Sequence, residues 1–142
     1  MRRMIYVCAL LLSGGLLAGC DDLGTFTDSN LNCDRVRSLS LGSSTSGSLD
    51  TSDCQLNDGS AVDYYRFRIS TSRNVYVSQQ SSVIEPYVAI LDEFGNLVAE
   101  EDNGAQGLSE LSAFLPSGTY YIAASSYGPG DYGSYFLDTD DN

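Results

Sequence analysis

The feature that most constrains the fold of this chain is a regular alternation, from Val36 onward, of short strand-forming runs with turn residues. Runs rich in Val, Ile, Tyr and Phe are separated by clusters of Gly, Asn, Asp and Ser. Short strands at this spacing are typical of β-sandwiches, and no segment repeats apolar residues at helical spacing. The pattern therefore predicts one all-β domain, a jelly-roll-like sandwich of about eight strands.

The clearest expected strand runs from Val62 to Ile69. Because successive side chains of a strand point to opposite faces, Tyr65 and Phe67 fall on one face and Tyr64 and Arg66 on the other. We expect the face of Tyr65 and Phe67 to be buried. Further strands are expected at 74–79, 84–91, 97–100, 109–115, 119–126 and 134–138, with one or two more between 35 and 49.

The N-terminal segment has the pattern of a lipoprotein signal peptide. Arg2 and Arg3 precede an apolar run, which ends in Leu17-Ala18-Gly19-Cys20. That tetrapeptide resembles the lipobox of bacterial lipoproteins, and a cysteine thiol is nucleophilic enough to be alkylated by a lipid donor. We predict a signal peptide at 1–19, lipidation of Cys20, and an exported protein held by acyl chains at a cell-envelope membrane. The alternative is an ordinary secreted protein cut near the same place.

The rest of the chain divides into a tether and a domain. Residues 20–32 are expected to form the lipidated cysteine and a flexible tether, and residues 33–142 the sandwich. After Cys8 leaves with the signal peptide and Cys20 is lipidated, two thiols remain, Cys33 and Cys54. In an oxidising compartment such a pair predicts a disulfide, worth about 3 kcal/mol for a loop of roughly twenty residues. The alternative, a metal site, lacks further Cys or His ligands.

Composition excludes several classes of function. The chain has a formal net charge of −12, and loss of Arg2 and Arg3 leaves five arginines against 19 acidic residues, a net charge of −14. Such a surface repels phosphate backbones, so nucleic acid is not an expected partner. The chain has no histidine, which removes the triads and zinc sites that depend on one. We therefore predict that it is not an enzyme.

Several stretches in order resemble the bacterial pre-peptidase C-terminal domain family. They are Gly47-Ser48-Leu49, the run from Ser52 to Ser60, Asp63-Tyr64-Tyr65-Arg66-Phe67, the hairpin from Leu91 to Asp102, Leu115-Pro116-Ser117-Gly118-Thr119-Tyr120-Tyr121-Ile122, and Gly133-Ser134-Tyr135-Phe136-Leu137. The resemblance implies a jelly-roll sandwich similar to collagenase collagen-binding domains, with a non-catalytic role in binding, targeting or solubility. The chain departs from the family in carrying no peptidase, and in having Glu85 where the family commonly places Asp.

Two sets of residues are candidate sites. The first is a calcium site, because hard oxygen donors gather on neighbouring turns at Asp92, Asn96, Glu101, Asp102 and Asn103. The alternative is that these residue types are present because Asp and Asn favour the backbone conformations of turns. Calcium is the one cofactor for which the sequence suggests a place.

The second candidate is an aromatic platform. The alternation places Tyr64, Tyr76, Phe114, Tyr121 and Phe136 opposite the expected core residues. On one exposed sheet these rings could stack on sugars or contact an extended polypeptide. The alternative is that strands favour aromatic residues in any case, and that a shift in the alternation would bury them.

These features favour a membrane-anchored binding or accessory module that contacts envelope or extracellular polymers, either polysaccharide or protein. A structural or assembly subunit of an envelope complex, recognising protein through edge strands, is the alternative.

Overall fold

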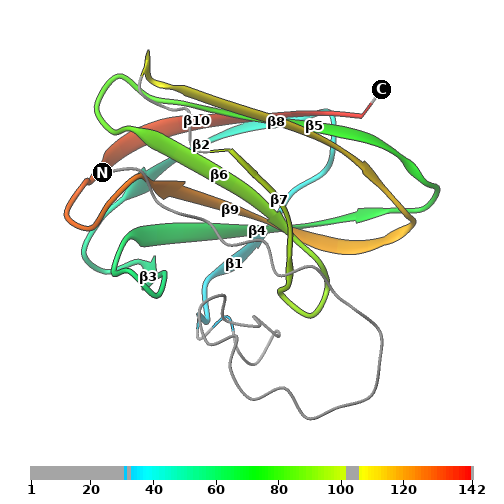
Figure 1. Cartoon of the computed structure of the whole chain (residues 1–142), viewed down its shortest axis with the longest axis horizontal. Helices are drawn as coiled ribbons and strands as arrows, with labels where there is room; N and C mark the ends of the chain where they lie inside the picture. The colour runs from blue at the N-terminus through cyan, green and yellow to red at the C-terminus, as the bar shows by residue number, and fades with distance from the viewer. Residues whose placement is uncertain (1–30, 32, 102–105, 142) are drawn as a thin grey trace, which may run out of the picture.

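The fold is a sandwich of two β-sheets, seen edge-on in Figure 1. A computed structural model describes residues 31, 33–101 and 106–141. Ten strands lie in this part of the chain, and none of its residues is in an α-helix. No helix among them could therefore cross a membrane. The predicted all-β sandwich with a single domain is confirmed.

The larger sheet has six strands. Its main path runs β1 (Val36–Ser38), β4 (Ala61–Ile69), β9 (Gly118–Ser126), β6 (Pro86–Leu91) and β7 (Leu97–Glu101), and β3 (Cys54–Gln55) also pairs with β4. β1 runs parallel to β4, and the other pairs are antiparallel. Pro86 is the first residue of its strand, a position that tolerates the missing N–H donor.

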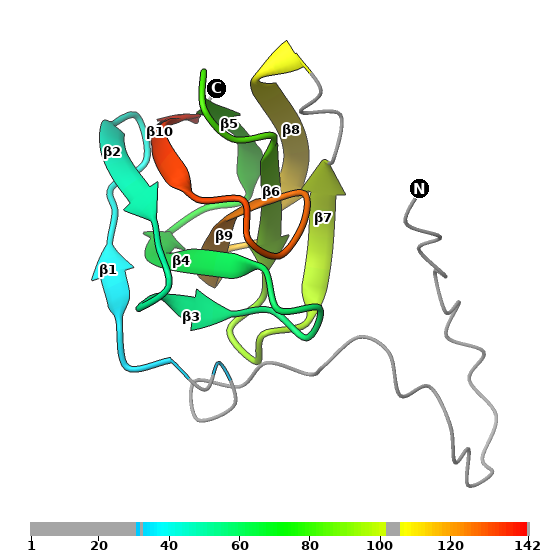
Figure 2. The same cartoon turned by 90° about the vertical axis from the view of Figure 1, so that its left-hand side faces the viewer.

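The smaller sheet has four antiparallel strands. Their order is β2 (Ser44–Leu49), β10 (Gly133–Asp140), β5 (Arg73–Gln80) and β8 (Leu108–Leu115). Figure 2 shows β1 and β2 along one edge of the sandwich and β7 and β8 along the other. Each predicted strand is present, with ends that differ by one or two residues. The region from 35 to 49 forms two strands, one in each sheet.

The main core fills the space between the two sheets. Tyr65 and Phe67 of β4 lie in it, as the alternation predicted, and so do Val75 and Val77 of β5. Side chains from β6, β8, β9 and β10 complete it. Among them are Val88, Ile90, Leu111, Leu115, Tyr120, Ile122, Ala124, Tyr135 and Leu137. Burial of these side chains is the main stabilising contribution to the sandwich.

A second apolar cluster covers part of the outer face of the six-stranded sheet. Its buried members are Leu31, Val62, Tyr64, Tyr87, Ala89, Leu91, Tyr121 and Ala123, with Cys33, Val36, Cys54, Leu56 and Leu97 packed against them. The predicted disulfide joins Cys33 to Cys54, with Cα atoms 5.5 Å apart, and so ties the segment before β1 to β3. As a result all six residues of β6 are buried, although the sheet has only one partner sheet.

Candidate functional site

The outer face of the four-stranded sheet is a regular surface that carries exposed aromatic side chains on neighbouring strands. The strand register shows which residues share it, because Phe136 lies opposite Ser46 on β2 and Gln80 on β5. We call this surface the aromatic face. Its residues, all exposed or half-buried, are Ser44, Ser46 and Ser48; Ser134, Phe136, Asp138 and Asp140; Asn74, Tyr76, Ser78 and Gln80; and Leu108, Glu110, Ser112 and Phe114.

Three aromatic residues cross this face on a diagonal. Phe114 on β8 is 66% exposed, Phe136 on β10 is 47% exposed, and Tyr76 on β5 lies between them and is half-buried. Phe114 is opposite Asn74, two residues from Tyr76, and Phe136 is opposite Gln80, four residues from Tyr76 on the other side. With standard strand rise and strand separation the diagonal is about 22 Å long, which is the length of about six or seven extended peptide residues.

Polar groups surround the aromatic residues. The Tyr76 hydroxyl donates a hydrogen bond to the Glu110 carboxylate on the neighbouring strand, which fixes the orientation of the phenol. This hydrogen bond, with a smaller contribution from burial, raises the pKa of Tyr76. Asp138 and Asp140 add carboxylates beside β5, and the face carries no arginine. It therefore offers apolar rings and hydrogen-bond acceptors without positive charge.

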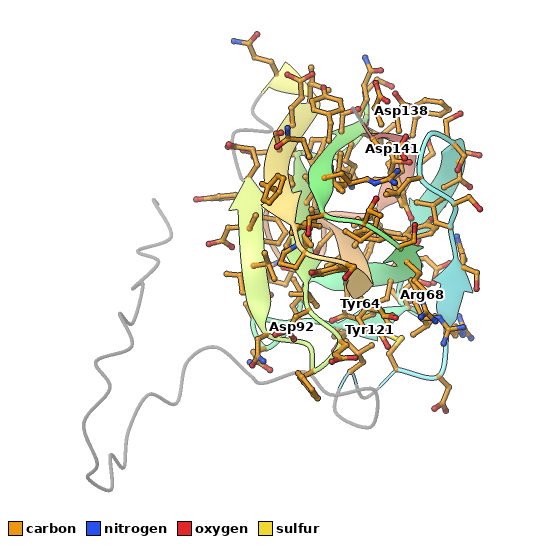
Figure 3. The ribbon with its side chains drawn as sticks, turned by 90° about the vertical axis from the view of Figure 1, so that its right-hand side faces the viewer. Tyr64, Arg68, Asp92, Tyr121, Asp138 and Asp141 are labelled. Carbon is orange, nitrogen blue, oxygen red and sulfur yellow. A yellow bond between two sulfur atoms is a disulfide. The ribbon has the colours of Figure 1, made fainter. Side chains whose placement is uncertain are left out.

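Tyr64 and Tyr121 do not belong to this face. Both are 1% exposed and lie in the second apolar cluster, on the outer face of the six-stranded sheet. Figure 3 shows them on the opposite side of the molecule from Asp138. Of the five aromatic residues considered for an exposed platform, these two are therefore buried, as the alternative interpretation allowed, whereas Tyr76, Phe114 and Phe136 share the aromatic face. Alternation correctly directed them away from the main core, but it could not show that a second cluster covers that side of the sheet.

Three of the residues proposed for calcium, Asp92, Asn96 and Glu101, lie in the described part of the chain, and they do not gather in one place. Asp92 and Asn96 lie in the turn between β6 and β7, where Asp92 Oδ1 accepts hydrogen bonds from the backbone N–H groups of Phe94 and Asn96 at 2.9 and 2.8 Å. Asp92 Oδ2 accepts one from the Asn96 side chain at 3.0 Å. Gly95 has a φ of 80°, as the predicted turn requires. The oxygens of Asp92 therefore hold the turn.

Glu101 lies far from that turn. It pairs with Val88 at the opposite end of β7, whereas Leu97 pairs with Leu91 next to the turn. Asp102 and Asn103 lie outside the described residues. Within the described part of the chain, no three His, Cys, Asp or Glu residues are placed to hold a metal ion together. The calcium site stays a prediction, and the three members that are described do not form one donor set.

A buried polar network, which sequence analysis missed, lies between the sheets near β1 and β2. Arg37 Nη1 donates to the Tyr65 hydroxyl at 3.1 Å, and the Tyr65 and Tyr135 hydroxyls are 2.5 Å apart. The Tyr135 hydroxyl donates to Asp63 Oδ2 at 2.5 Å, so Tyr65 must be the donor to Tyr135. Each hydroxyl thus donates once and accepts once. The sequence feature that could have predicted this network is Asp63. It is an acidic residue that alternation places on the same, core-facing side of the strand as Tyr65 and Phe67.

The electrostatics of the network follow from its burial. Desolvation raises the pKa of Asp63, although the Tyr135 hydrogen bond and the Arg37 charge oppose that shift. Desolvation and the hydrogen bond to Asp63 raise the pKa of Tyr135 far above its ordinary value. Asp63 is only 5% exposed. A carboxylate and a phenol in this position bridge the two sheets and are shielded from any substrate in solution.

Three solved structures share the fold. The chain has 21% identity to the pre-peptidase C-terminal domain of collagenase from Bacillus anthracis, with a TM-score of 0.58, covering 74% of this chain and 94% of that one. It has 10% identity to PliG of Aeromonas hydrophila, a periplasmic inhibitor of g-type lysozyme, with a TM-score of 0.53 and coverage of 76% and 98%. It has 9% identity to CorA of Methylomicrobium album BG8, a surface-associated copper-binding protein, with a TM-score of 0.55 and coverage of 76% and 99%.

These comparisons establish a shared architecture. No family model matches the chain, and no curated protein matches its sequence. The sequence identities are low, whereas the alignments cover nearly the whole of each solved structure. The chain therefore has the fold of small bacterial β-sandwich proteins, among them a pre-peptidase C-terminal domain.

Proposed function

We propose that this protein is a non-catalytic module, anchored to a cell-envelope membrane through Cys20, that binds a polymer of the envelope or the extracellular matrix. The aromatic face is the binding surface. The observation that carries the proposal is the diagonal of Phe136, Tyr76 and Phe114 on a regular, uncovered sheet. Exposed aromatic rings on a flat surface stack on sugar rings and on extended peptides.

Export is supported by two independent features. The pattern of residues 1–20 is that of a lipoprotein precursor. The Cys33–Cys54 disulfide is typical of proteins in oxidising compartments. Two of the structural neighbours are described as periplasmic or surface-associated, which agrees with the same location.

A binding role fits the chemistry better than catalysis does. The chain has no histidine, and the buried pair of Asp63 and Tyr135 is occupied in holding the two sheets together. The aromatic face itself carries Glu110, Asp138 and Asp140 without a cationic side chain. Carboxylates accept hydrogen bonds from sugar hydroxyls or peptide N–H groups, and they repel polyanions. The expected ligand is therefore a neutral polysaccharide or an extended polypeptide.

A pull-down tests the proposal. The fragment 21–142 is suitable because it contains every described strand and the disulfide. The fragment is immobilised and exposed to envelope and matrix extracts, either with calcium or with a chelator. Phe114→Ala combined with Phe136→Ala should abolish retention, because truncating the two most exposed aromatic side chains of this face removes most of the binding energy. Retention that is lost only in the chelator would support the calcium prediction.

The matched control replaces two exposed apolar residues elsewhere. Phe94→Ala with Val98→Ala alters side chains that are 57% and 44% exposed on the β6–β7 hairpin. This variant should retain the ligand like the wild type. If both double variants behave alike, or if the wild type retains nothing that a positive-control module retains, the proposal fails.

A second candidate function, a subunit that recognises protein by strand addition, rests on β2. This strand forms an edge of the four-stranded sheet, and its sequence Ser-Thr-Ser-Gly-Ser-Leu has no charge and no proline. Natural edge strands are commonly protected by such residues, and unprotected edges accept a partner strand. Crosslinking in intact cells separates the candidates, because an assembly subunit gives one stoichiometric protein partner, whereas polymer retention without one favours the binding module.

A further inference from the structure

Two neighbouring arginines on the outer face of the six-stranded sheet have no acidic partner among the described residues. Arg66 and Arg68 lie on β4, both exposed, and their cross-strand neighbours on β9 are Tyr121 and Thr119. Because they are two residues apart on one face, their Cα atoms are about 7 Å apart. Within the described part of the chain neither makes an ion pair or a side-chain hydrogen bond.

This is unusual in so acidic a chain. The other three described arginines each have a carboxylate within 4 Å. Arg35 lies 3.9 Å from Asp53, Arg37 lies 3.8 Å from Asp63, and Arg73 forms an ion pair with Asp141. With 19 acidic residues against seven arginines, acidic partners are abundant. Two adjacent positive charges without a partner repel each other, and they are available to pair with an anion outside the chain.

The arginine pair lies on the face that the N-terminal segment reaches. Leu31 and Cys33 pack in the second apolar cluster on this face, beside Tyr64 of the same strand. Figure 3 shows Arg68 near Tyr64 and Asp138 on the far side of the molecule. Arg68 also lines a pocket with Arg73 and Asp141, and Asp141 forms its ion pair with Arg73. Ten residues lie between Cys20 and Leu31. They span at most about 40 Å, so an anchor at Cys20 holds this face close to the membrane.

The two outer faces differ in charge. The aromatic face carries Glu110, Asp138 and Asp140 and no arginine. The opposite face carries Arg66 and Arg68 on β4, and on β7 it carries Glu100, whose carboxylate accepts a hydrogen bond from the Tyr87 hydroxyl. Anionic headgroups attract arginine near the bilayer surface and repel carboxylates, and this interaction extends over about one Debye length, roughly 8 Å at physiological salt. A tethered domain with this asymmetry turns its arginine side toward an anionic bilayer.

We propose that Arg66 and Arg68 contact the anionic headgroups of the membrane that carries the lipid anchor. The six-stranded sheet then faces the bilayer, and the aromatic face points away from it toward the polymer. The inference rests on the anchored, polymer-binding function proposed above, and it adds the orientation in which that function is carried out. Its partner is a lipid surface with negative charge.

A fluorescence experiment on the tethered domain tests the orientation. In the chain 20–142, Cys20 is the only thiol outside the disulfide, so it can be coupled to a maleimide lipid in preformed vesicles. The chain has no tryptophan. Ser38→Trp therefore introduces a single reporter on an exposed residue opposite Arg66, and Phe114→Trp introduces one on the aromatic face. Brominated acyl chains in phosphatidylcholine vesicles, with or without phosphatidylglycerol, quench a tryptophan that is near the bilayer.

The expected result is stronger quenching of Trp at position 38 than at position 114, by about twofold or more, on vesicles with phosphatidylglycerol at low salt. Arg66→Gln with Arg68→Gln should remove this difference. Ser44→Glu with Ser46→Glu changes the net charge by the same amount on the opposite face and should preserve it. Equal quenching at both positions in the parent chain, or a difference that survives loss of both arginines, overturns the proposal.

Other outcomes remain distinguishable. If the arginine pair instead binds a soluble polyanion such as alginate while the quenching pattern does not depend on it, the partner is a polymer and the proposal is wrong. Retention of the neutral polymer by the aromatic face is measured on the fragment 21–142 without a membrane. Failure of that assay counts against the binding function alone, and fatty acid missing from Cys20 in cells counts against the anchor.

Discussion

At the scale of single residues, Asp63 shows how a polar group can be placed inside a sandwich. Its carboxylate accepts a hydrogen bond from the Tyr135 hydroxyl and lies 3.8 Å from Arg37. Even so, burial raises the pKa of Asp63, so desolvation outweighs these contacts. A carboxyl whose pKa is higher in the folded state contributes stability below its unfolded pKa and loses that contribution as the pH rises through the folded value.

Asp63→Asn should therefore gain stability relative to the wild type as the pH rises. Asparagine can still accept the Tyr135 hydrogen bond, and it has no charge to desolvate. Urea unfolding followed by circular dichroism, from about pH 3 to about pH 7, measures the difference on either side of the ordinary Asp pKa. Asp34→Asn, at an exposed position, is the control. A difference between Asp63→Asn and wild type that does not change with pH would contradict this account.

Gly47 makes the same network possible. A Cβ at this position would lie 2.2 Å from the Tyr135 hydroxyl oxygen, which is held by Tyr65 and Asp63 and cannot easily move. Gly47→Ala should lower the free energy of unfolding by about 1–3 kcal/mol, as is typical of overpacking. At Gly128 an added Cβ would meet nothing within 4 Å. If Gly47→Ala proves no more destabilising than Gly128→Ala, the network is looser than described.

At the scale of strands, alternation predicted most of the structure. On β4 the apolar Tyr65 and Phe67 alternate with the charged Arg66. Because successive strand residues point to opposite faces, this alternation predicted which face of β4 is buried. It could not assign strands to sheets, since a jelly-roll pairs residues far apart in sequence. Nor could it predict that Tyr64 and Tyr121 are covered. Their burial involves the segment around Leu31 and Cys33, which has no periodicity of its own.

The Cys33–Cys54 disulfide is the covalent link in the second apolar cluster, which covers Tyr64 and Tyr121. Cys33→Ser with Cys54→Ser opens a loop with a sequence separation of 21 and should lower the free energy of unfolding by about 3 kcal/mol. The main core between the sheets does not include either cysteine, so the variant should keep its β-rich circular dichroism spectrum. Thermal unfolding of the variant, beside wild type with and without reductant, measures the loss. Reduced wild type should match the variant, and an unchanged unfolding temperature would show that the segment before β1 is held by packing alone.

At the scale of the whole molecule, the two sheets have different outer surfaces. The six-stranded sheet carries the second apolar cluster, the disulfide and the arginine pair, while the four-stranded sheet is open and carries acidic and aromatic side chains. Composition revealed the acidic excess, but it could not show that Glu110, Asp138 and Asp140 lie on the other sheet from Arg66 and Arg68, because that depends on which strands are neighbours. The functions that we propose use both surfaces, with the outer face of the six-stranded sheet toward a membrane and the aromatic face toward the ligand.

The most direct test of that account is a map of the ligand on the surface of the protein. Backbone NMR shifts of the isotope-labelled fragment 21–142 are followed while the polymer retained in the pull-down is added. The account predicts that the shifts concentrate at Ser46, Tyr76, Ser112, Phe114 and Phe136, all on one sheet face. Shifts confined to the six-stranded sheet or to the β6–β7 hairpin, with the aromatic face unchanged, would contradict it.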